Sequence, residues 1–293
     1  MVNFLKYRFL YLFISMIVIG SGLFSIVKWG YRFSIDFVGG TSLEYQIKNP
    51  ISKKDLESIA KSNKVEMVDH KYGNKTLAIR SKPMTEKQES DFKTAIDKKT
   101  GGNLLILRSE TVGPTLGRET MVKTGIASLL AIFGILLYMS FAFKGFKFAL
   151  SAILAMIHDF LVVVGSYSLL SRFFGAEVDT MFVTAVLTTM SFSVHDTIVI
   201  FDKIREYAQT EESVNIEQFA NRALTETMVR SINNSMTIIF MLLALSLMGG
   251  STIRFFVITL LIGTITGTYS SPFVATPILV WLVKQKKNGS HDN

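Results

Sequence analysis

The sequence predicts an α-helical polytopic membrane protein with six transmembrane helices and an α+β, ferredoxin-like domain outside the cytoplasm. Three observations predict this fold: long apolar segments, one polar segment with strand and helix signals, and unevenly placed basic residues. Apolar residues make up 49% of the 293 residues, and the mean hydropathy is +0.36. Such a composition exceeds that of a soluble domain of this size. The formal charge of +8 therefore fits the cytoplasmic loops of a membrane protein better than nucleic-acid binding.

Each of six segments is apolar enough and long enough to cross a bilayer, which takes roughly 20 residues per helix. These segments are 9–27, 124–143, 148–170, 180–201, 231–248 and 255–283. The first follows basic residues, as a signal peptide does, but it lacks a convincing cleavage site and is predicted to be an uncleaved anchor. Pro272 and Pro277 lie in the last segment and predict a kink or an end that leaves the membrane.

The basic residues of the short loops predict the orientation, because they concentrate on the cytoplasmic side. With the N-terminus inside, the inside segments carry Lys6, Arg8, Lys144, Lys147, Lys203, Arg205, Arg222, Arg230, Lys284, Lys286 and Lys287. The short outside loops then carry only Arg172 and Arg254. Both termini are therefore predicted to be cytoplasmic.

This topology divides the chain into a first helix (1–29), an extracytoplasmic domain (30–118) and the remaining helices (119–293). In the domain, "TSLEYQI", "VEMVDHK", "KTLAIRS" and "NLLILRSETV" have strand patterns. Capping signals at Ser52 and Thr85 begin two helices. The turn and stop signals are Gly73-Asn74 and Gly101-Gly102. The resulting order β-α-β-β-α-β is that of the ferredoxin-like fold.

The loop after the fourth span predicts a cytoplasmic amphipathic helix at about 213–229. Its apolar residues recur at helical spacing, at Ile216, Phe219, Ala220, Ala223, Leu224 and Met228. We favour a helix that faces the protein core or lies at the membrane interface over one that binds a separate partner.

Two carboxyl groups lie inside predicted spans, Asp159 in the third and Asp196 in the fourth. A charge in hydrocarbon is costly, so such residues face protein or water and usually carry function. Thr189 and Ser193 share one helical stripe with Asp196. The antiparallel fifth span carries a second stripe, at Arg230, Asn233, Asn234 and Thr237. Asp196 and Arg230 both fall in the cytoplasmic half of the bilayer, where they can meet as a proton relay or as a static lock between helices.

Histidine precedes each of these aspartates. His158 and Asp159 fall near mid-bilayer, where either a structural hydrogen bond or proton transfer is open. Because they are adjacent, they are predicted to point in different directions and to form no dyad. His195 points about 100° away from the Thr189–Ser193 stripe, which predicts a packing or partner contact.

Enzyme motifs are missing from the sequence, which has no HExxH, GxSxG or Walker loop and no cysteine. Without cysteine there is no thiolate-rich metal site, and no metal or cofactor is predicted. The glycine-rich pieces "DFVGG", "GPTLG" and "MGG" all fall at the predicted outer face, away from ATP. A non-enzymatic membrane protein is expected.

Six motifs in order resemble the SecF family of bacterial protein-export membrane proteins. They are "FSIDFVGGT" (33–41), "ETVGPTLGRE" (110–119), "SVHDTIVIFDKIRE" (193–206), "RSINNSMT" (230–237), "GGSTIRFF" (249–256) and "GTYSSPF" (267–273). The family signatures fall on Asp36, Gly39, Gly40, Gly113 and Pro114. Together these motifs cover nearly the whole chain, and the third is the most specific.

This resemblance implies one half of an RND-superfamily unit in the bacterial cytoplasmic membrane, paired with SecD and working with the SecYEG channel and SecA on an exported polypeptide. It implies that Asp196 handles protons with Arg230 as its basic partner, and that H⁺, or alternatively Na⁺, drives movements of the outer domain. Asn234 stands where the family usually has threonine, which puts a direct relay role for it in doubt. The supporting residues are Thr189, Ser193, Asn234, His158 and Asp159.

Two other hypotheses remain from the sequence. One is half of an RND-type proton-coupled exporter of small molecules or lipids, although such proteins normally carry both halves in one chain. The other is a structural subunit whose polar residues only hold helices together, since such contacts contribute roughly 0.6–2 kcal/mol.

Overall fold

The computed structural model describes residues 3–73, 75–143, 145–210 and 215–288. Three predicted features fall partly outside the described residues: Asn74 of the turn, Lys144 of an inside loop, and residues 213–214 of the amphipathic helix. The chain divides into two compact units. One comprises Met1–Arg32 with Ala127–Asn293, and the other comprises Phe33–Ile126, which overlaps the predicted domain.

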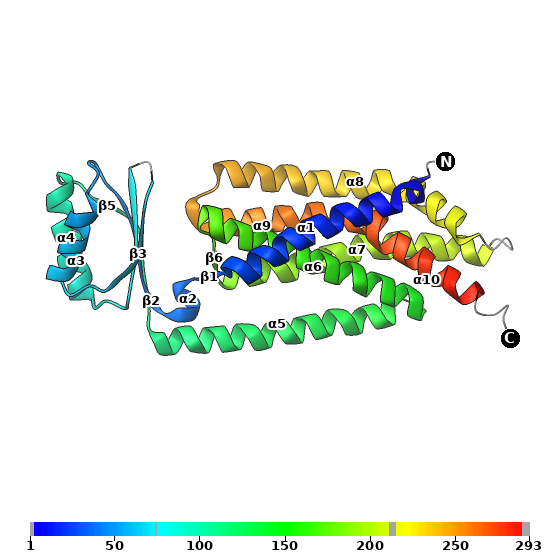
Figure 1. Ribbon diagram of the computed structural model, residues 1–293, viewed down its shortest axis with the longest axis horizontal. Coiled ribbons are helices and arrows are strands. Elements are labelled where there is room, and N and C mark those ends of the chain that lie inside the picture. The colour runs from blue at the N-terminus through cyan, green and yellow to red at the C-terminus, as the bar shows by residue number, and fades with distance from the viewer. Residues whose placement is uncertain (1–2, 74, 144, 211–214, 289–293) are drawn as a thin grey trace. The chain divides into compact units, whose positions relative to one another are not determined.

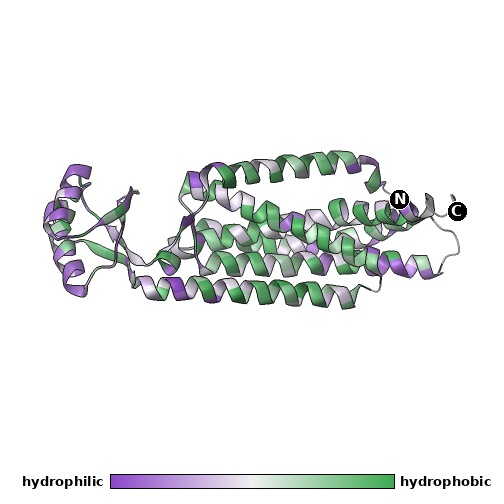
Figure 2. Ribbon diagram, turned by 60° about the horizontal axis from the view of Figure 1, so that its bottom comes forward, coloured by the Kyte–Doolittle hydropathy of each residue, from purple (hydrophilic) through white to green (hydrophobic). Residues whose placement is uncertain are grey.

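Within the described ranges, six helices are long and apolar enough to cross a membrane, which confirms the predicted polytopic fold (Figures 1 and 2). The helices are α1 (Arg8–Trp29), α5 (Pro114–Ala142), α6 (Phe146–Phe174), α7 (Thr180–Thr210), α8 (Ile216–Met248), and α9 (Ser251–Ser270) continued by η2 (Ser271–Ala275) and α10 (Thr276–Asn288). A short 3₁₀ helix, η1 (Phe4–Tyr7), precedes α1, and the two-residue strands β1 (Arg32–Phe33) and β6 (Glu177–Val178) follow α1 and α6.

The predicted cytoplasmic helix is not a separate element, because α8 runs without a break from Ile216 through the fifth span. Its described apolar face is core-facing, as expected: Phe219, Ala220, Ala223 and Leu224 are buried. The sequence predicted two helices here, at about 213–229 and at 231–248, because polar residues around position 230 interrupt the apolar pattern. No glycine or proline stands between residues 216 and 248, so nothing in the backbone chemistry ends the helix there.

The two prolines of the last span mark a change of helix type. Ser271–Ala275 form a π-helical turn between α9 and α10, and Figure 1 shows α10 leaving the line of α9. Pro272 has no N–H and its ring clashes with the carbonyl four residues earlier, so a wider turn accommodates it. The predicted irregularity is therefore confirmed, whereas an end of the helix at this point is wrong.

Small residues let the membrane helices approach closely. A Cβ on Gly22 of α1 would stand 2.6 Å from the Cα of Gly165 on α6. One turn further along this crossing, the hydroxyls of Ser25 and Ser168 lie 2.8 Å apart. Since lipid supplies no hydrophobic drive between helices, this close backbone contact and the polar pair hold α1 against α6.

The second unit has the predicted β-α-β-β-α-β order. Its elements are β2 (Gly40–Gln46), α3 (Lys53–Ser62), β3 (Met67–Tyr72), β4 (Thr76–Ser81), α4 (Glu86–Thr100) and β5 (Leu105–Val112), preceded by α2 (Ile35–Val38). The antiparallel sheet has the strand order β3-β4-β2-β5, which is that of the ferredoxin-like fold. Its core consists of one face of the sheet and the apolar faces of α3 and α4, with Leu43, Tyr45, Leu56, Leu77, Ile79, Phe92 and Ile96 nearly inaccessible.

The predicted helix boundaries of this unit are confirmed by their caps. The Ser52 hydroxyl accepts from the Asp55 amide at the start of α3. Thr85 and Gln88 form a reciprocal capping box at the start of α4. Gly101 ends α4 in the left-handed conformation that favours glycine.

Two of the sequence motifs meet within this unit. Gly39 and Gly40 have φ values of +75° and +137°, and Gly40 pairs with Val112 as β2 begins. A Cβ on Gly39 would stand 2.8 Å from the Cα of Pro114, and one on Gly117 would stand 2.7 Å from the amide nitrogen of Gly39. These glycines therefore form a tight strand entry in which two backbone segments touch.

We expect Gly39→Ala to destabilise this unit by about 1–3 kcal/mol, because the new methyl group meets backbone and the residue must keep a positive φ. Gly113→Ala, in the partner motif, is the matched control, since a Cβ there meets nothing within 4 Å. Hydrogen exchange of the β2 amides in the full chain measures the difference. Equal protection in the two variants would contradict the close contact.

Acid should loosen the contact between α3 and α4. The Ser52 hydroxyl, 2.7 Å from Asp55 Oδ2, and the Lys99 ammonium, 3.3 Å from Oδ1, lower the pKa of Asp55 below its usual 3.8. A pKa lowered by folding gives stability that is present above the unfolded value and is lost as the pH falls through the folded value. Asp55→Asn should remove this small dependence, measured as the NMR titration of the α3 amides.

Candidate functional site

Asp196 lies at the wall of a polar cavity between α7 and α8. The cavity has a volume of about 210 Å³ and is lined by His195, Asp196, Val199, Ile200, Thr227, Arg230, Ser231 and Asn234. The carboxylate is 5% exposed, and its Oδ2 accepts a hydrogen bond of 2.7 Å from the Ser231 hydroxyl. A cavity of this size has room for several water molecules, so Asp196 is buried by protein on one side and faces an open space on the other.

Arg230 lines the same cavity as Asp196 but does not contact the Asp196 carboxylate directly. Among the described residues, no ion pair within 4 Å joins the two side chains, although both line one cavity, where they can interact across it. The guanidinium still acts on the carboxylate through space. Asn234 lines the same wall one turn further along α8. The arrangement leaves room for water between the carboxylate and its cation.

A second cavity continues the first along the α7–α8 seam. It is lined by Val199, Asp202, Lys203, Glu206, Glu226, Thr227 and Arg230, and so shares Val199, Thr227 and Arg230 with the first. Lys203 reaches both Glu206, at 3.0 Å, and Glu226 of α8, at 3.6 Å. Charged side chains therefore line the part of the second cavity that is farther from Asp196. Arg230 lines both cavities and stands where they join.

The polar stripe of α8 lies on the surface of the chain. Arg230, Asn233, Asn234 and Thr237 are all exposed, and so is His195 on α7. Polar groups are costly against lipid. This face therefore requires cover by another polar protein surface or by water.

The stripe of α7 divides between two sites. Thr189 bonds to the Val186 carbonyl, and its methyl group fills the space beside Gly263 of α9. Ser193 donates its hydroxyl to Asp159 of α6 and packs against Gly267. Although all three residues share one buried face, only Asp196 lines the α7–α8 cavity.

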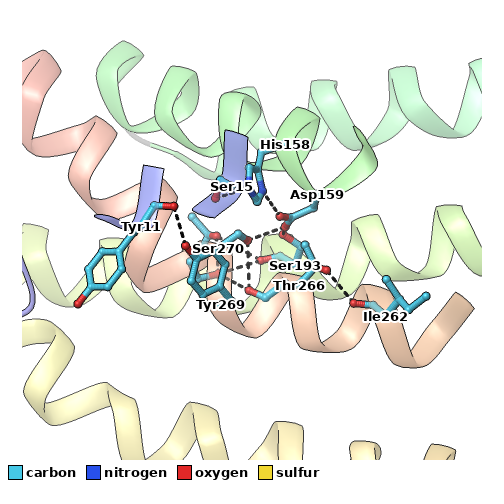
Figure 3. Close-up of polar contacts among 12 residues, drawn as sticks. Tyr11, Ser15, His158, Asp159, Ser193, Ile262, Thr266, Tyr269 and Ser270 are labelled. Atoms are coloured by element: carbon cyan, nitrogen blue, oxygen red, sulfur yellow. Dashed lines mark hydrogen bonds and ion pairs between the residues drawn. The ribbon is translucent and has the colours of Figure 1, made fainter. Parts of the chain in front are cut away.

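His158 and Asp159 form a hydrogen-bonded pair, so the prediction that they form no dyad is wrong. His158 Nδ1 lies 2.8 Å from Asp159 Oδ1, and both residues are buried (Figure 3). Neighbouring helical residues diverge at Cβ, but Nδ1 and a carboxylate oxygen lie only two bonds further out and can turn back toward each other. Asp159 Oδ2 also accepts from Ser193 and, at 2.6 Å, from Ser270 of α9.

His195 does not turn fully away from Asp196. It lines the same cavity while remaining exposed on the chain surface. The helical angle separates the Cβ atoms correctly, but the imidazole is large enough to reach the rim of the cavity. The predicted packing or partner contact of His195 stays a prediction, and its exposed position leaves it accessible to a partner.

Several hydroxyl groups of this site were missed from the sequence. Ser231 bonds to Asp196, Ser15 to His158, and Ser270 to Asp159. Ser231 stands next to the predicted stripe in "RSINNSMT", and Ser270 in "GTYSSPF" lies two residues before Pro272, at which the α-helix changes to a π-helical turn. Serine is common in membrane helices, so only the three-dimensional pairing distinguishes these residues.

The signature residues Asp36, Gly39, Gly40, Gly113 and Pro114 belong to the ferredoxin-like unit and take no part in the intramembrane cavity. Asp36 lies in the first turn of α2, where its amide donates to Ser34. Within the described residues, no group of three His, Cys, Asp or Glu side chains could hold a metal ion.

The fold and site define a class: polytopic helical membrane proteins with ionisable groups buried between helices and a ferredoxin-like domain in one loop. Residues 92–285 match the family described as protein export membrane protein SecD/SecF, C-terminal. The chain is 40% identical to the protein translocase subunit SecF of Thermobaculum terrenum, covering 96% of this chain and 93% of that protein. It is 32% identical to the subunit of the same name from Pseudomonas aeruginosa, covering 96% and 91%. The chain belongs to the SecF family of protein translocase subunits.

A solved structure shares this fold. The crystal structure of SecDF from Thermus thermophilus, described as a translocon-associated membrane protein, superposes with a TM-score of 0.84 at 27% identity. The comparison covers 97% of this chain but 39% of that one. This chain therefore spans less than half of the SecDF polypeptide, although it spans nearly all of the separate SecF subunits.

Water should reach Asp196 along the α7–α8 seam. The chain has no cysteine, so a cysteine introduced in place of Thr227 is the only thiol that can react. Thr227 lines both cavities, and the reaction of this thiol therefore measures whether water is present there. Only a hydrated thiol ionises and reacts with a charged thiol reagent. We expect Thr227→Cys to react in inside-out vesicles, whereas Met241→Cys, an exposed residue of the apolar part of α8, should not.

Two results would contradict this expectation. If Thr227→Cys reacts no faster than Met241→Cys, the cavities hold no water. If it reacts only when the reagent is applied to the outside of intact cells, the predicted orientation is reversed.

Proposed function

We propose that this chain is the SecF subunit of a SecDF complex, in which the proton motive force assists export of polypeptides across the bacterial cytoplasmic membrane. The observation that carries this proposal is Asp196, a carboxyl buried within a membrane helix at the wall of a cavity that it shares with Arg230. The proposed coupling ion is H⁺, and no other cofactor is invoked.

The surroundings of Asp196 favour two states. As a carboxylate it is attracted to Arg230 across the cavity and accepts the Ser231 hydrogen bond. As a neutral acid it loses the attraction to Arg230 but also the cost of a buried charge. These opposed contributions let a proton bind and leave with modest changes in the surroundings, and each change alters the force between α7 and α8.

The second cavity supplies one end of a proton path. It continues from Arg230 toward Lys203, Glu206 and Glu226, residues that the basic-residue distribution assigns to the cytoplasmic side. On this topology both termini are cytoplasmic and residues 30–118 lie outside. A proton released from Asp196 would leave along this seam toward the cytoplasm.

The exposed polar face of α8 supports a partner within the membrane. Arg230, Asn233, Asn234 and Thr237 cannot face lipid at low cost. A SecD-type chain with its own set of spans and its own intramembrane carboxyl would cover this face and complete the proton path. The complex would then act beside the SecYEG channel, after SecA, with the ferredoxin-like unit moving against the exported polypeptide.

Asp196→Asn keeps the size of the side chain but cannot titrate, so export that depends on the proton motive force should fall to the level of cells lacking this subunit. Thr188→Val, on the same helix but exposed and outside both cavities, is the control and should export normally, since the Thr188 hydroxyl bonds within α7 to the Thr184 carbonyl. Export of a reporter protein from cells, with the proton gradient present or collapsed, measures both. Replacing the proton gradient by a Na⁺ gradient tests the choice of ion.

Co-purification separates a relay from a structural role. If Asp196 and Arg230 only hold helices together, Asp196→Asn and Arg230→Ala lose the SecD-type partner and export together. If the relay proposal holds, the partner stays bound and export alone is lost. Full export by Asp196→Asn, or a chain that works as a homo-oligomer on small molecules, would overturn the proposal.

A further inference from the structure

A second titratable site lies among α1, α6, α7 and α9, outside the cavity of Asp196. His158 and Asp159 bond to each other at 2.8 Å, and His158 Nε2 lies 2.9 Å from the Ser15 hydroxyl of α1. Ser193 of α7 and Ser270 of α9 both donate to Asp159 Oδ2. Figure 3 shows these side chains converging from four helices on one point.

In the part of the chain that the structure describes, no basic side chain of another helix forms an ion pair with Asp159. Ser15 meets the pair of His158 and Asp159 from α1, Ser193 from α7, and Ser270 with the Tyr269 ring from α9. Tyr269 uses its hydroxyl on the Tyr11 carbonyl, 2.9 Å away. Among the described residues, the basic side chain that contacts Asp159 is His158, its neighbour on the same helix. The nearest further carboxyl along α7 is Asp196, three residues beyond Ser193.

Charge balance then assigns one proton to the pair. With one shared proton the site is neutral, either as imidazolium and carboxylate or as imidazole and carboxylic acid. Without that proton the site holds one net negative charge. A buried charge costs free energy, and Asp159 is only 3% exposed. The proton can therefore leave only when the site opens or when charge elsewhere in the bundle changes.

The contacts of Asp159 connect this site to the helix that carries Asp196. Ser193 donates to Asp159, and Thr197, the residue after Asp196, bonds to Ser271 at 2.9 Å. Ser271 begins the π-helical turn η2, and Ser270 directly precedes it. π-helical turns are rare and concentrate at functional sites. A shift of α7 that follows protonation of Asp196 must change the contacts around Asp159.

We propose that His158 and Asp159 form a second proton-binding site of the membrane unit, linked to Asp196 through Ser193 and the π-helical turn. One proton binds to the pair and changes its charge from −1 to 0. It leaves for water, or for the other carboxyl, when the Ser193 and Ser270 contacts open. Because negative charge at either carboxyl disfavours negative charge at the other, the two sites release protons in sequence. The inference rests on the proposed function for its role in export but not for the existence of the site.

Solid-state NMR of the full chain in lipid vesicles tests the site without measuring export. Labelling with ¹⁵N-histidine and ¹³C-aspartate reports the protonation of both partners across pH, and His158→Gln and Asp159→Asn assign their signals. We expect His158 and Asp159 to titrate together in one step. In Asp196→Asn the step should persist and its midpoint should move to lower pH, because the wild-type Asp196 carboxylate favours a bound proton at the pair and this variant removes its negative charge.

A serine variant supplies a test if Asp159→Asn does not fold. Ser270→Ala removes one donor that stabilises the carboxylate, so the shared proton should be held more tightly and the midpoint should move to higher pH. Ser246→Ala is the control, since that hydroxyl bonds only within α8, to the Leu243 carbonyl, and should cause no shift.

The outcomes are distinct from those of the export assay. A pair that keeps one protonation state over the whole pH range in which the protein stays folded would overturn the second site and leave the role of Asp196 untouched. A titrating pair whose midpoint is the same with and without Asp196 would overturn the link between the sites. A displaced midpoint together with normal export by Asp196→Asn would support the site and overturn the proposed function.

Discussion

The cost of an uncompensated charge in hydrocarbon organises this molecule. Asp159 is covered by its histidine and two hydroxyls from other helices, whereas Asp196 has one serine partner and a cavity that leads to charged side chains. Each carboxyl therefore requires several helices to be in place at once. The same contacts that make these groups tolerable also make the packing of α6, α7, α8 and α9 sensitive to their charge.

Close helix packing is the second requirement, and it is met by small residues. Thr189 and Ser193 fit against Gly263 and Gly267 of α9, four residues apart, as in other tight membrane helix pairs. This places the Ser193 hydroxyl beside Asp159, whereas Asp196, on the same face of α7, lines the α7–α8 cavity. α7 therefore carries side chains of both sites, the enclosed one around Asp159 and the cavity at Asp196, and a small displacement of α7 changes the contacts of both.

The sequence predicted the six helices, the β-α-β-β-α-β unit and its caps because each depends on local patterns: apolar length, alternation and capping chemistry. It also located the intramembrane carboxyls, since a charge in an apolar run is conspicuous. It did not predict which side chains contact each other. It separated His158 from Asp159 and split α8 in two, because side-chain reach and the packing of other helices do not appear in a helical projection.

The sequence by itself determined the class of protein and which residues are costly enough to be functional, because hydropathy and motif order are properties of the chain alone. The tertiary structure decided which hydroxyl serves which carboxyl, which faces remain exposed, and where the cavities lie. Those features depend on angles and distances between helices that are far apart in sequence. Ser270 illustrates the difference: it is an ordinary serine in the sequence, and only the packing of α9 against α6 brings it to Asp159.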